Sequence, residues 1–193
     1  MWALVAVALI ALGIWQTGAL TPFSSEPGNG HTATGANSDP GLVVYPPGTR
    51  SKAPQLEGAT LDGAAFRLSE YAGDIIVINV WGSWCGPCRA ETPDLVRLAR
   101  QNADRGVRFV GIDTRDNLGS ARAFVKKFDV PYPSLFDEGG RVLLPFRDVI
   151  PTAVIPSSIV IDREGKVAAR VIGPVTYNTL KGVLDDELSG GKK

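Results

Sequence analysis

Two closely spaced cysteines constrain the fold of this chain more than any other feature. Cys85 and Cys88 are the only cysteines among 193 residues, and they follow a continuous apolar run at residues 75–80. A run that is continuous rather than alternating indicates a buried parallel strand. After Pro87 the apolar residues fall at helical spacing, and proline suits a first helical turn. The sequence therefore predicts a strand, a turn and a helix, with the cysteine pair at the start of the helix.

This position favours redox chemistry. At a helix N-terminus, unpaired backbone N–H groups and the helix dipole stabilise a thiolate. We therefore predict that Cys85 is a nucleophile with a pKa below the free-thiol value of ~8.5. The three-residue spacing brings Cys88 within disulfide reach, so we assign it as the resolving cysteine. Two cysteines allow a single Cys85–Cys88 disulfide, which excludes a disulfide scaffold.

Composition excludes several other classes of function. Lys and Arg number 20, as do Asp and Glu, so the formal net charge is zero. No basic field is available to recruit nucleic acid. A structural zinc site needs four ligands, and the only histidine, His31, lies in a Pro- and Gly-rich stretch. We expect no metal, no cofactor and no nucleic-acid partner; a metal-binding or purely structural role for the cysteines is the non-enzymatic alternative.

The N-terminal part divides into two segments. Residues 1–20 carry no charged side chain, and about 20 helical residues span the ~30 Å of a bilayer core. We predict a membrane anchor there; a signal peptide is the alternative, because residues 17–19 offer a small-x-small cleavage site. Residues 21–53 are rich in Pro, Gly, Ser and Thr, which predicts a flexible linker. The folded domain is then residues 54–190, anchored on the extracytoplasmic side of a membrane or secreted after cleavage.

Hydrophobic patterning predicts an α/β domain in which strands and helices alternate before a final hairpin and helix. The predicted elements are a hairpin around residues 62–63, strands at 75–80, 107–112, 134–136, 159–162 and 167–172, and helices at 87–105, 121–128, 142–146 and 180–188.

Four features together resemble a known family. They are the WCGPC box (84–88), the RAETP continuation (89–93), the IPSSIVID stretch (155–162), and the extra segment between the second strand and that stretch. With them the chain resembles the thioredoxin superfamily, and within it the membrane-tethered TlpA/ResA-type thiol–disulfide oxidoreductases, a group that includes cytochrome c maturation proteins. The resemblance covers residues 54–188. It implies a thioredoxin-like fold, with a central mixed β-sheet flanked by helices, an N-terminal hairpin and a central insertion.

The resemblance also implies a docking surface for substrate beside the cysteines. It implies that the Ile155–Pro156 bond is cis and faces the Cys85 sulfur. From the residues alone, a proline is allowed at the first position of a strand, and an ordinary trans bond remains open. The residues expected to form the docking surface are Trp84, Gly86, Pro87, Ile155 and Pro156.

Two positions concern proton handling. Thioredoxin has a buried aspartate six residues before its first cysteine, where this chain has Asn79. Glu91 matches an acidic position of the TlpA/ResA branch, where it is expected to relay a proton to or from Cys88. The alternative is a carboxylate near a helix N-terminus that is only favourable to the helix dipole.

The expected activity is disulfide exchange with protein substrates. The dipeptide Gly86-Pro87 is that of thioredoxin, whose couple near about −270 mV favours reduction, so we expect a reductant. The expected partners are exported protein thiols, with apocytochrome c as one candidate, and an integral-membrane thiol carrier that resupplies electrons. Alternatives are an oxidant or isomerase in disulfide formation, and a peroxiredoxin-like antioxidant, against which the CxxC spacing argues.

Overall fold

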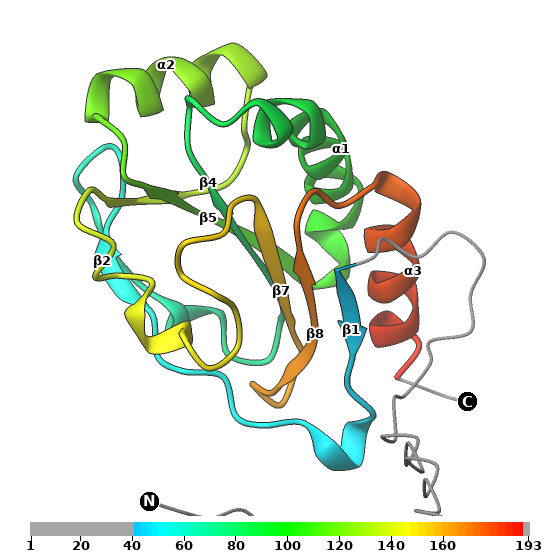
Figure 1. Ribbon diagram of the computed structural model, residues 1–193. Coiled ribbons are helices and arrows are strands. Elements are labelled where there is room, and N and C mark those ends of the chain that lie inside the picture. Colours follow the sequence, from blue (N-terminus) through cyan, green and yellow to red (C-terminus); the bar gives the residue numbers. More distant parts are fainter. Residues whose placement is uncertain (1–40, 191–193) are drawn as a thin grey trace, which may run out of the picture. The chain divides into compact units, whose positions relative to one another are not determined.

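A six-stranded sheet forms the centre of the domain (Figure 1). The computed structural model describes residues 41–190. The strand order is β1-β8-β7-β4-β5-β6, and β2 and β3 form a separate hairpin. The strands are β1 (Leu42–Val44), β2 (Glu57–Ala59), β3 (Ala65–Arg67), β4 (Ile75–Trp81), β5 (Val107–Thr114), β6 (Ser134–Asp137), β7 (Ser157–Ile161) and β8 (Val167–Ile172). The helices are α1 (Gly86–Asn102), α2 (Leu118–Phe128) and α3 (Tyr177–Leu188), with short 3-10 turns η1 (Pro47–Thr49), η2 (Leu68–Tyr71), η3 (Ala103–Arg105) and η4 (Leu144–Phe146).

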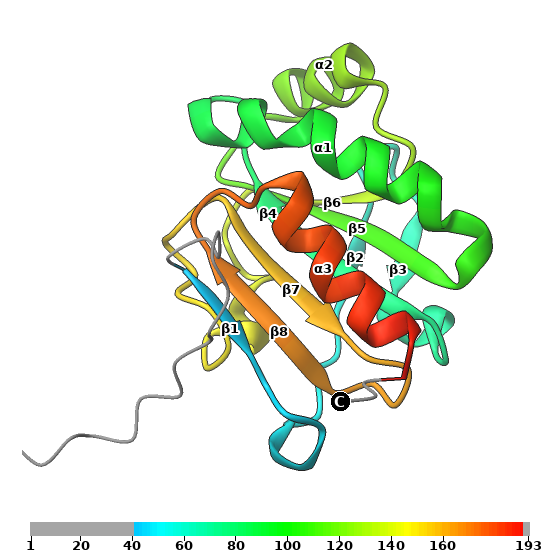
Figure 2. The ribbon, with the colours of Figure 1, turned by 90° about the vertical axis from the view of Figure 1, so that its right-hand side faces the viewer.

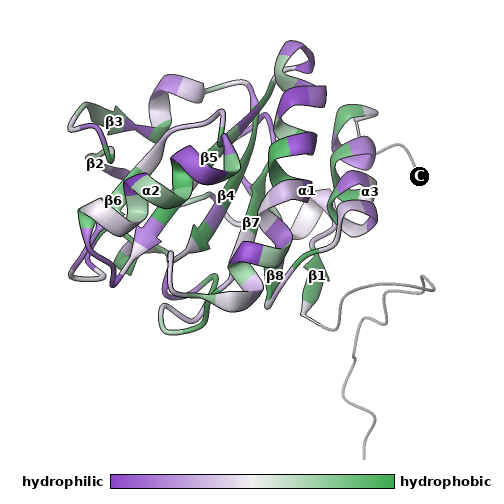
Figure 3. Ribbon diagram, turned by 90° about the horizontal axis from the view of Figure 1, so that it is seen from above, coloured by the Kyte–Doolittle hydropathy of each residue, from purple (hydrophilic) through white to green (hydrophobic). Residues whose placement is uncertain are grey.

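Strand β4 lies in the middle of the sheet and is buried at every residue. It runs parallel to β5 and antiparallel to β7, which makes the sheet mixed. Its apolar run therefore faces protein on both sides, as its continuous hydrophobicity indicates. Figure 3 shows hydrophobic colouring along β4 and alternating colours around α1. The predicted strand, the hairpin around residues 62–63 and the mixed sheet are confirmed.

Helices α1 and α3 lie side by side on one face of the sheet (Figure 2). Leu95 and Leu98 of α1 and Leu184 of α3 pack with sheet residues such as Val77 and Phe109 in one buried cluster. These positions recur at helical spacing, so one stripe of each helix is buried. Helix α1 is thereby held rigidly on the sheet, with its N-terminus beyond the carboxyl end of β4.

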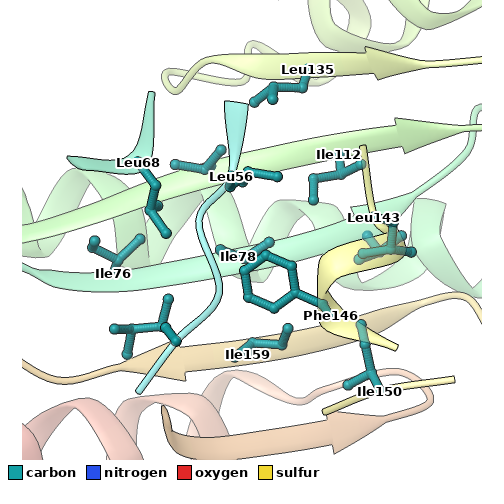
Figure 4. Close-up of a cluster of buried hydrophobic side chains, with 14 of the residues drawn as sticks. Leu56, Leu68, Ile76, Ile78, Ile112, Leu135, Leu143, Phe146, Ile150 and Ile159 are labelled. Carbon is teal, nitrogen blue, oxygen red and sulfur yellow. The ribbon is translucent and has the colours of Figure 1, made fainter. Parts of the chain in front are cut away.

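The segment between β6 and β7 covers the opposite face (Figure 4). Its side chains Leu143, Phe146 and Ile150 are almost fully buried against Ile78 and Ile159. This segment is the central insertion that the resemblance implies, and η4 lies within the brief helix predicted at 142–146. The insertion therefore completes the hydrophobic core and leads the chain to residue 155.

Residues 41–53 require a correction. Their composition predicts linker, but β1 pairs antiparallel with β8, and η1 follows it. The strand has only three residues, two of them exposed, so its stability comes from pairing with β8 rather than from a pattern of its own. Residues 1–20 and 21–40, predicted as anchor and linker, lie outside the described residues. Within residues 41–190 no helix combines the length and apolarity that a membrane crossing needs.

A buried ion cluster fixes this N-terminal segment to the domain. Arg50 binds Asp162 at 2.9 Å and Glu187 at 2.7 Å, and all three side chains are at most 8% exposed. Asp162 follows β7 and Glu187 lies in α3, so one guanidinium joins three parts of the chain. Residues 41–53 therefore belong to the folded domain.

Candidate active site

The cysteine pair occupies the N-terminus of α1 as a disulfide. The Cα atoms of Cys85 and Cys88 lie 5.3 Å apart, and the S–S distance is 2.02 Å. Cys85 is the N-cap residue, and its sulfur accepts a hydrogen bond from the Cys88 backbone N at 3.2 Å. Cys85 is 4% exposed and Cys88 is 0% exposed. Cys85 is therefore the sulfur that a partner reaches first, and the predicted position at a helix N-terminus is confirmed.

Local sequence explains why the helix starts here. Pro87 occupies one of the first two helical positions, where its missing N–H group costs no hydrogen bond. Gly86 and Pro87 are exposed, whereas Cys88 faces the protein interior. The two residues between the cysteines thus form the outer surface of the turn, as expected of docking residues.

Trp84 and the segment before β7 flank the cysteines. Trp84 is 57% exposed and donates a hydrogen bond from Nε1 to the Arg115 carbonyl oxygen at 3.1 Å. The Ile155–Pro156 peptide bond is cis, as the resemblance implies. The Ile155 side chain packs against the cluster that contains both cysteines. Its backbone N–H and C=O make no hydrogen bond with any other described residue, so they are available to an extended partner chain.

A loop that was not predicted from the sequence connects the segment before Cys85 with the segment before Pro156. It follows β5 and contains Arg115 and Asp116. Asp116 Oδ2 accepts from the Ser83 backbone N at 2.6 Å, and Arg115 Nη2 donates to the Ala153 carbonyl oxygen at 3.1 Å. With the bond from Trp84, the loop holds the segment before Cys85 and the segment before Pro156. The position of this loop in the sequence is the one clue to its role: it follows β5, and polar residues at the carboxyl ends of neighbouring parallel strands lie together.

Glu91 is buried one turn beyond Cys88 and binds two N–H groups. Oε1 accepts from Asn79 Nδ2 at 2.8 Å, and Oε2 accepts from the Val175 backbone N at 2.8 Å. Asn79 also donates to Ser158 Oγ at 3.2 Å. Asn79 and Glu91, singled out separately in the sequence, therefore lie in one polar network. Neither sulfur of the disulfide carries a proton, so the proton relay stays a prediction.

Arg89 contacts a backbone carbonyl and two aromatic rings. Its Nη1 donates to the Ser83 carbonyl oxygen at 3.0 Å, and its guanidinium lies 5.7 Å from the ring centroids of Phe124 and Phe128. Phe124 in turn stacks on Trp81 at 4.4 Å. This aromatic layer packs against both cysteines and links α1 to α2.

Asp113, at the end of β5, is a buried acid that sequence reasoning missed. It is 0% exposed, and neither carboxyl oxygen receives a hydrogen bond from any described donor. Burial, and then the negative charge of Asp116, raise the pKa of Asp113 to about 8. Although burial raises the pKa of Asp116, hydrogen bonds from the backbone N–H groups of Ser83 and Asn117 help to lower it overall. Asp113 thus keeps its proton at neutral pH while Asp116 is ionised.

The chemistry available at this site is thiol–disulfide exchange. The Cys85 sulfur is the more accessible of the two, Cys88 is fully buried, and exposed apolar and backbone groups flank the pair. Within the described residues, no cluster of His, Cys, Asp and Glu side chains has the arrangement of a metal site.

Comparison with known proteins agrees with this geometry. The model of the AhpC/TSA family matches residues 49–170. The chain belongs to the AhpC/TSA family. The match runs from before β2 into β8 and includes both cysteines, so it covers the site and all of the sheet except β1 and the end of β8.

Individual relatives narrow the assignment within this family. The thiol-disulfide oxidoreductase ResA of Bacillus thuringiensis subsp. konkukian is 31% identical over 133 residues, which are 69% of this chain and 75% of that protein. The thiol:disulfide interchange protein HelX of Rhodobacter capsulatus is 27% identical over 164 residues, 84% of this chain and 89% of that protein. A crystal structure of a DsbF homologue from Corynebacterium diphtheriae has a TM-score of 0.72 and 31% identity, and covers 81% of this chain and 96% of that one. This family member is therefore a thioredoxin-like thiol–disulfide oxidoreductase of the ResA/HelX type, as its sequence predicts.

Proposed function

We propose that this protein reduces disulfides in exported proteins through Cys85 and Cys88. The Cys85 thiolate attacks one sulfur of a substrate disulfide, forms a mixed disulfide and releases the other substrate sulfur as a thiolate. The Cys88 thiolate then attacks Cys85, which releases the reduced substrate and leaves the disulfide seen here. Two electrons pass from the cysteine pair to the substrate, and the two released substrate thiolates take up protons.

One observation carries the reducing direction. The Cys85 sulfur accepts a single hydrogen bond, from Cys88 N, and no described Arg, Lys or His side chain donates to it. Strong disulfide oxidants gain their potential by stabilising the reduced form, above all its thiolate. Because Arg89 binds Ser83 and two aromatic rings instead, the added stabilisation here is the helix N-terminus alone. We therefore place the couple on the reducing side.

We further propose that the domain acts outside the cytoplasm. The support is the uncharged apolar stretch at residues 1–20 and the ResA and HelX relatives. Outside the cytoplasm a reductant must be recharged, so an integral-membrane thiol carrier is the proposed electron source. Apocytochrome c is the proposed substrate within a cytochrome c maturation pathway.

A redox titration tests the direction. Full-length protein is equilibrated with dithiothreitol or glutathione couples, and the Cys85–Cys88 pair is followed by thiol alkylation. A potential near that of thioredoxin, about −270 mV, is expected. A potential above about −180 mV, the range of oxidising folding catalysts, contradicts the proposed direction and favours an oxidant or isomerase.

A trapping experiment tests the assignment of the cysteines and the substrate. Cys88→Ser, expressed in the native membrane, should accumulate mixed disulfides through Cys85, because the resolving thiol is absent. Cys85→Ser is the matched control. Equal trapping by both variants contradicts the assigned roles, and the trapped partner identifies the substrate. Peroxide consumption by the wild type as fast as its disulfide reduction would instead favour a peroxiredoxin-like antioxidant.

A further inference from the structure

The carboxyl end of β5 carries two acids behind the docking surface. Asp113 is the one acid of the strand and is fully buried, and Asp116 follows three residues later in the loop. Ionised carboxylate oxygens only accept hydrogen bonds, so the two groups can bond to each other only when one of them is protonated. Neither Asp113 oxygen has a donor among the described residues, whereas Asp116 accepts from Ser83 and Asn117. The proton of such a pair therefore belongs to Asp113, and Asp116 is the acceptor.

Three contacts tie this acid pair to the surface where substrate docks. Asp116 accepts the Ser83 N–H, two residues before Cys85. The neighbouring Arg115 accepts the Trp84 indole N–H through its carbonyl oxygen. The Arg115 guanidinium donates to Ala153, just before the Ile155–Pro156 bond. The position of the loop thus determines the position of both sides of the site, the Ser83–Trp84 wall and the segment before Pro156.

We propose that Asp113 is a positioning residue, which as a neutral acid donates a hydrogen bond to Asp116 and so holds the Ser83–Trp84 wall of the docking surface in place. When Asp113 loses its proton, its buried carboxylate and the half-buried carboxylate of Asp116 repel each other. The loop then moves away from β5, and the hydrogen bonds to Ser83 and Trp84 weaken. Substrate docking is therefore coupled to one buried proton, in addition to the titration of the thiols themselves. This inference rests on the proposed function only for its kinetic consequence.

Within residues 41–190, no cationic side chain is among the groups that shift the pKa of Asp113. Neighbouring strand β4 contributes Trp81 in register with it, and β6 contributes Phe136. Asp137, at the end of β6, adds a further negative charge that acts on Asp113. The nearby helices carry Arg89 on α1 and Arg122 on α2, and their side chains donate to the carbonyl oxygens of Ser83 and Leu61.

The direct test is a pH titration of the oxidised full-length protein, in which neither cysteine titrates. The Ser83 amide and the Trp84 indole N–H are followed by two-dimensional nitrogen–proton NMR between pH 6 and 10, with Trp84→Phe to assign the indole. We expect both signals to shift in one transition centred near the pKa of Asp113, about 8. Constant signals across this range overturn the proposal.

Three variants make the assignment specific. Asp113→Asn should abolish the transition, because its amide still donates to Asp116 but cannot ionise. Asp116→Asn should move the midpoint to lower pH, since the repelling charge is gone. Asp148→Asn, at a side chain that is 88% exposed, is the control and should titrate like the wild type. An unchanged transition in Asp113→Asn, or its loss in Asp148→Asn, contradicts the proposal.

Exchange kinetics supply the functional readout. For a protein disulfide, KM is expected to rise about twofold to tenfold as Asp113 ionises, the ratio that corresponds to one lost hydrogen bond. The rise should be absent in Asp113→Asn, and kcat should follow the thiols in both proteins. An equal rise of KM in Asp113→Asn overturns the coupling. If the wild type exchanges no disulfide at any pH, the proposed function fails, while the NMR titration still decides the role of the acid pair.

Discussion

Replacement of Glu91 by leucine is expected to lower the free energy of unfolding by about 2–5 kcal/mol. In the folded protein, Glu91 accepts from Asn79 and from Val175, and the carboxylate is 4% exposed. Leucine fills a similar volume but accepts neither hydrogen bond. A buried donor left without an acceptor costs about 1–3 kcal/mol. Asn79 keeps its hydrogen bond to Ser158, so its unpaired N–H contributes a cost at the lower end of this range. Most of the lost free energy of unfolding therefore comes from the Val175 N–H.

Replacement of Glu91 by glutamine should cost much less, about 1 kcal/mol. Glutamine supplies one acceptor oxygen and one N–H group. The oxygen can accept from Val175, and Asn79 can turn its amide so that its own oxygen faces the new N–H. The difference between the two variants therefore measures the hydrogen bonds rather than the volume of the side chain.

Urea denaturation of the oxidised proteins at neutral pH gives these free energies. Glu70→Gln, at an exposed glutamate in η2, is the control and should match the wild type. If the leucine variant is as stable as the glutamine variant, Glu91 does not anchor this network and the reasoning is refuted.

The same variants distinguish a structural role of Glu91 from a role in transferring a proton to or from Cys88. Because both oxygens of Glu91 already bind N–H groups, we expect the glutamine variant to exchange disulfides at a rate within about twofold of wild type. General acid–base catalysis contributes about a hundredfold or more. A loss of that size in a variant of near wild-type stability would establish a relay and contradict our expectation.

Three further predictions follow from other contacts. Arg50→Met leaves the buried Asp162 and Glu187 carboxylates unpaired and should cost about 3–5 kcal/mol in urea denaturation, whereas Arg67→Met at an exposed pair should cost less than about 1 kcal/mol. Asp113→Asn should become more stable than wild type as the pH rises from 4 to 8. The pKa of Asp113 is raised from 3.8 to about 8 in the folded state, so the wild type loses folding free energy as the pH rises between these two values. The loss is up to about 1.4 kcal/mol per pH unit. Equal slopes of stability against pH in the two proteins would contradict this. Trp84→Ala should raise KM for a protein disulfide and leave the reduction of the oxidised enzyme by dithiothreitol unchanged, because the exposed indole is predicted to dock substrate.

Sequence patterns predict the parts of this fold that depend on residues adjacent in the sequence. Strand β4 is recognisable because seven consecutive residues are buried in the sheet. The start of α1 is recognisable because Pro87 follows the N-cap by two positions. Strand β1 was missed, since a three-residue edge strand buries too little to leave a pattern in the sequence. Its position depends on pairing with β8 and on the ion cluster of Arg50.

The contacts that hold the site residues in place cannot be predicted from sequence, for the same physical reason. Glu91 accepts from a backbone amide 84 positions later, and Trp84 donates to a carbonyl oxygen 31 positions later. Backbone groups carry no side-chain signature, so only the fold determines which of them lies beside a given residue. Asp113 illustrates the consequence: it is one of 20 acidic residues in the sequence, and its proton is explained only by burial between β4 and β6 and by Asp116. The cysteine pair therefore indicates which reaction occurs, while the contacts made by the loop after β5 determine under which conditions the surface around the pair is formed.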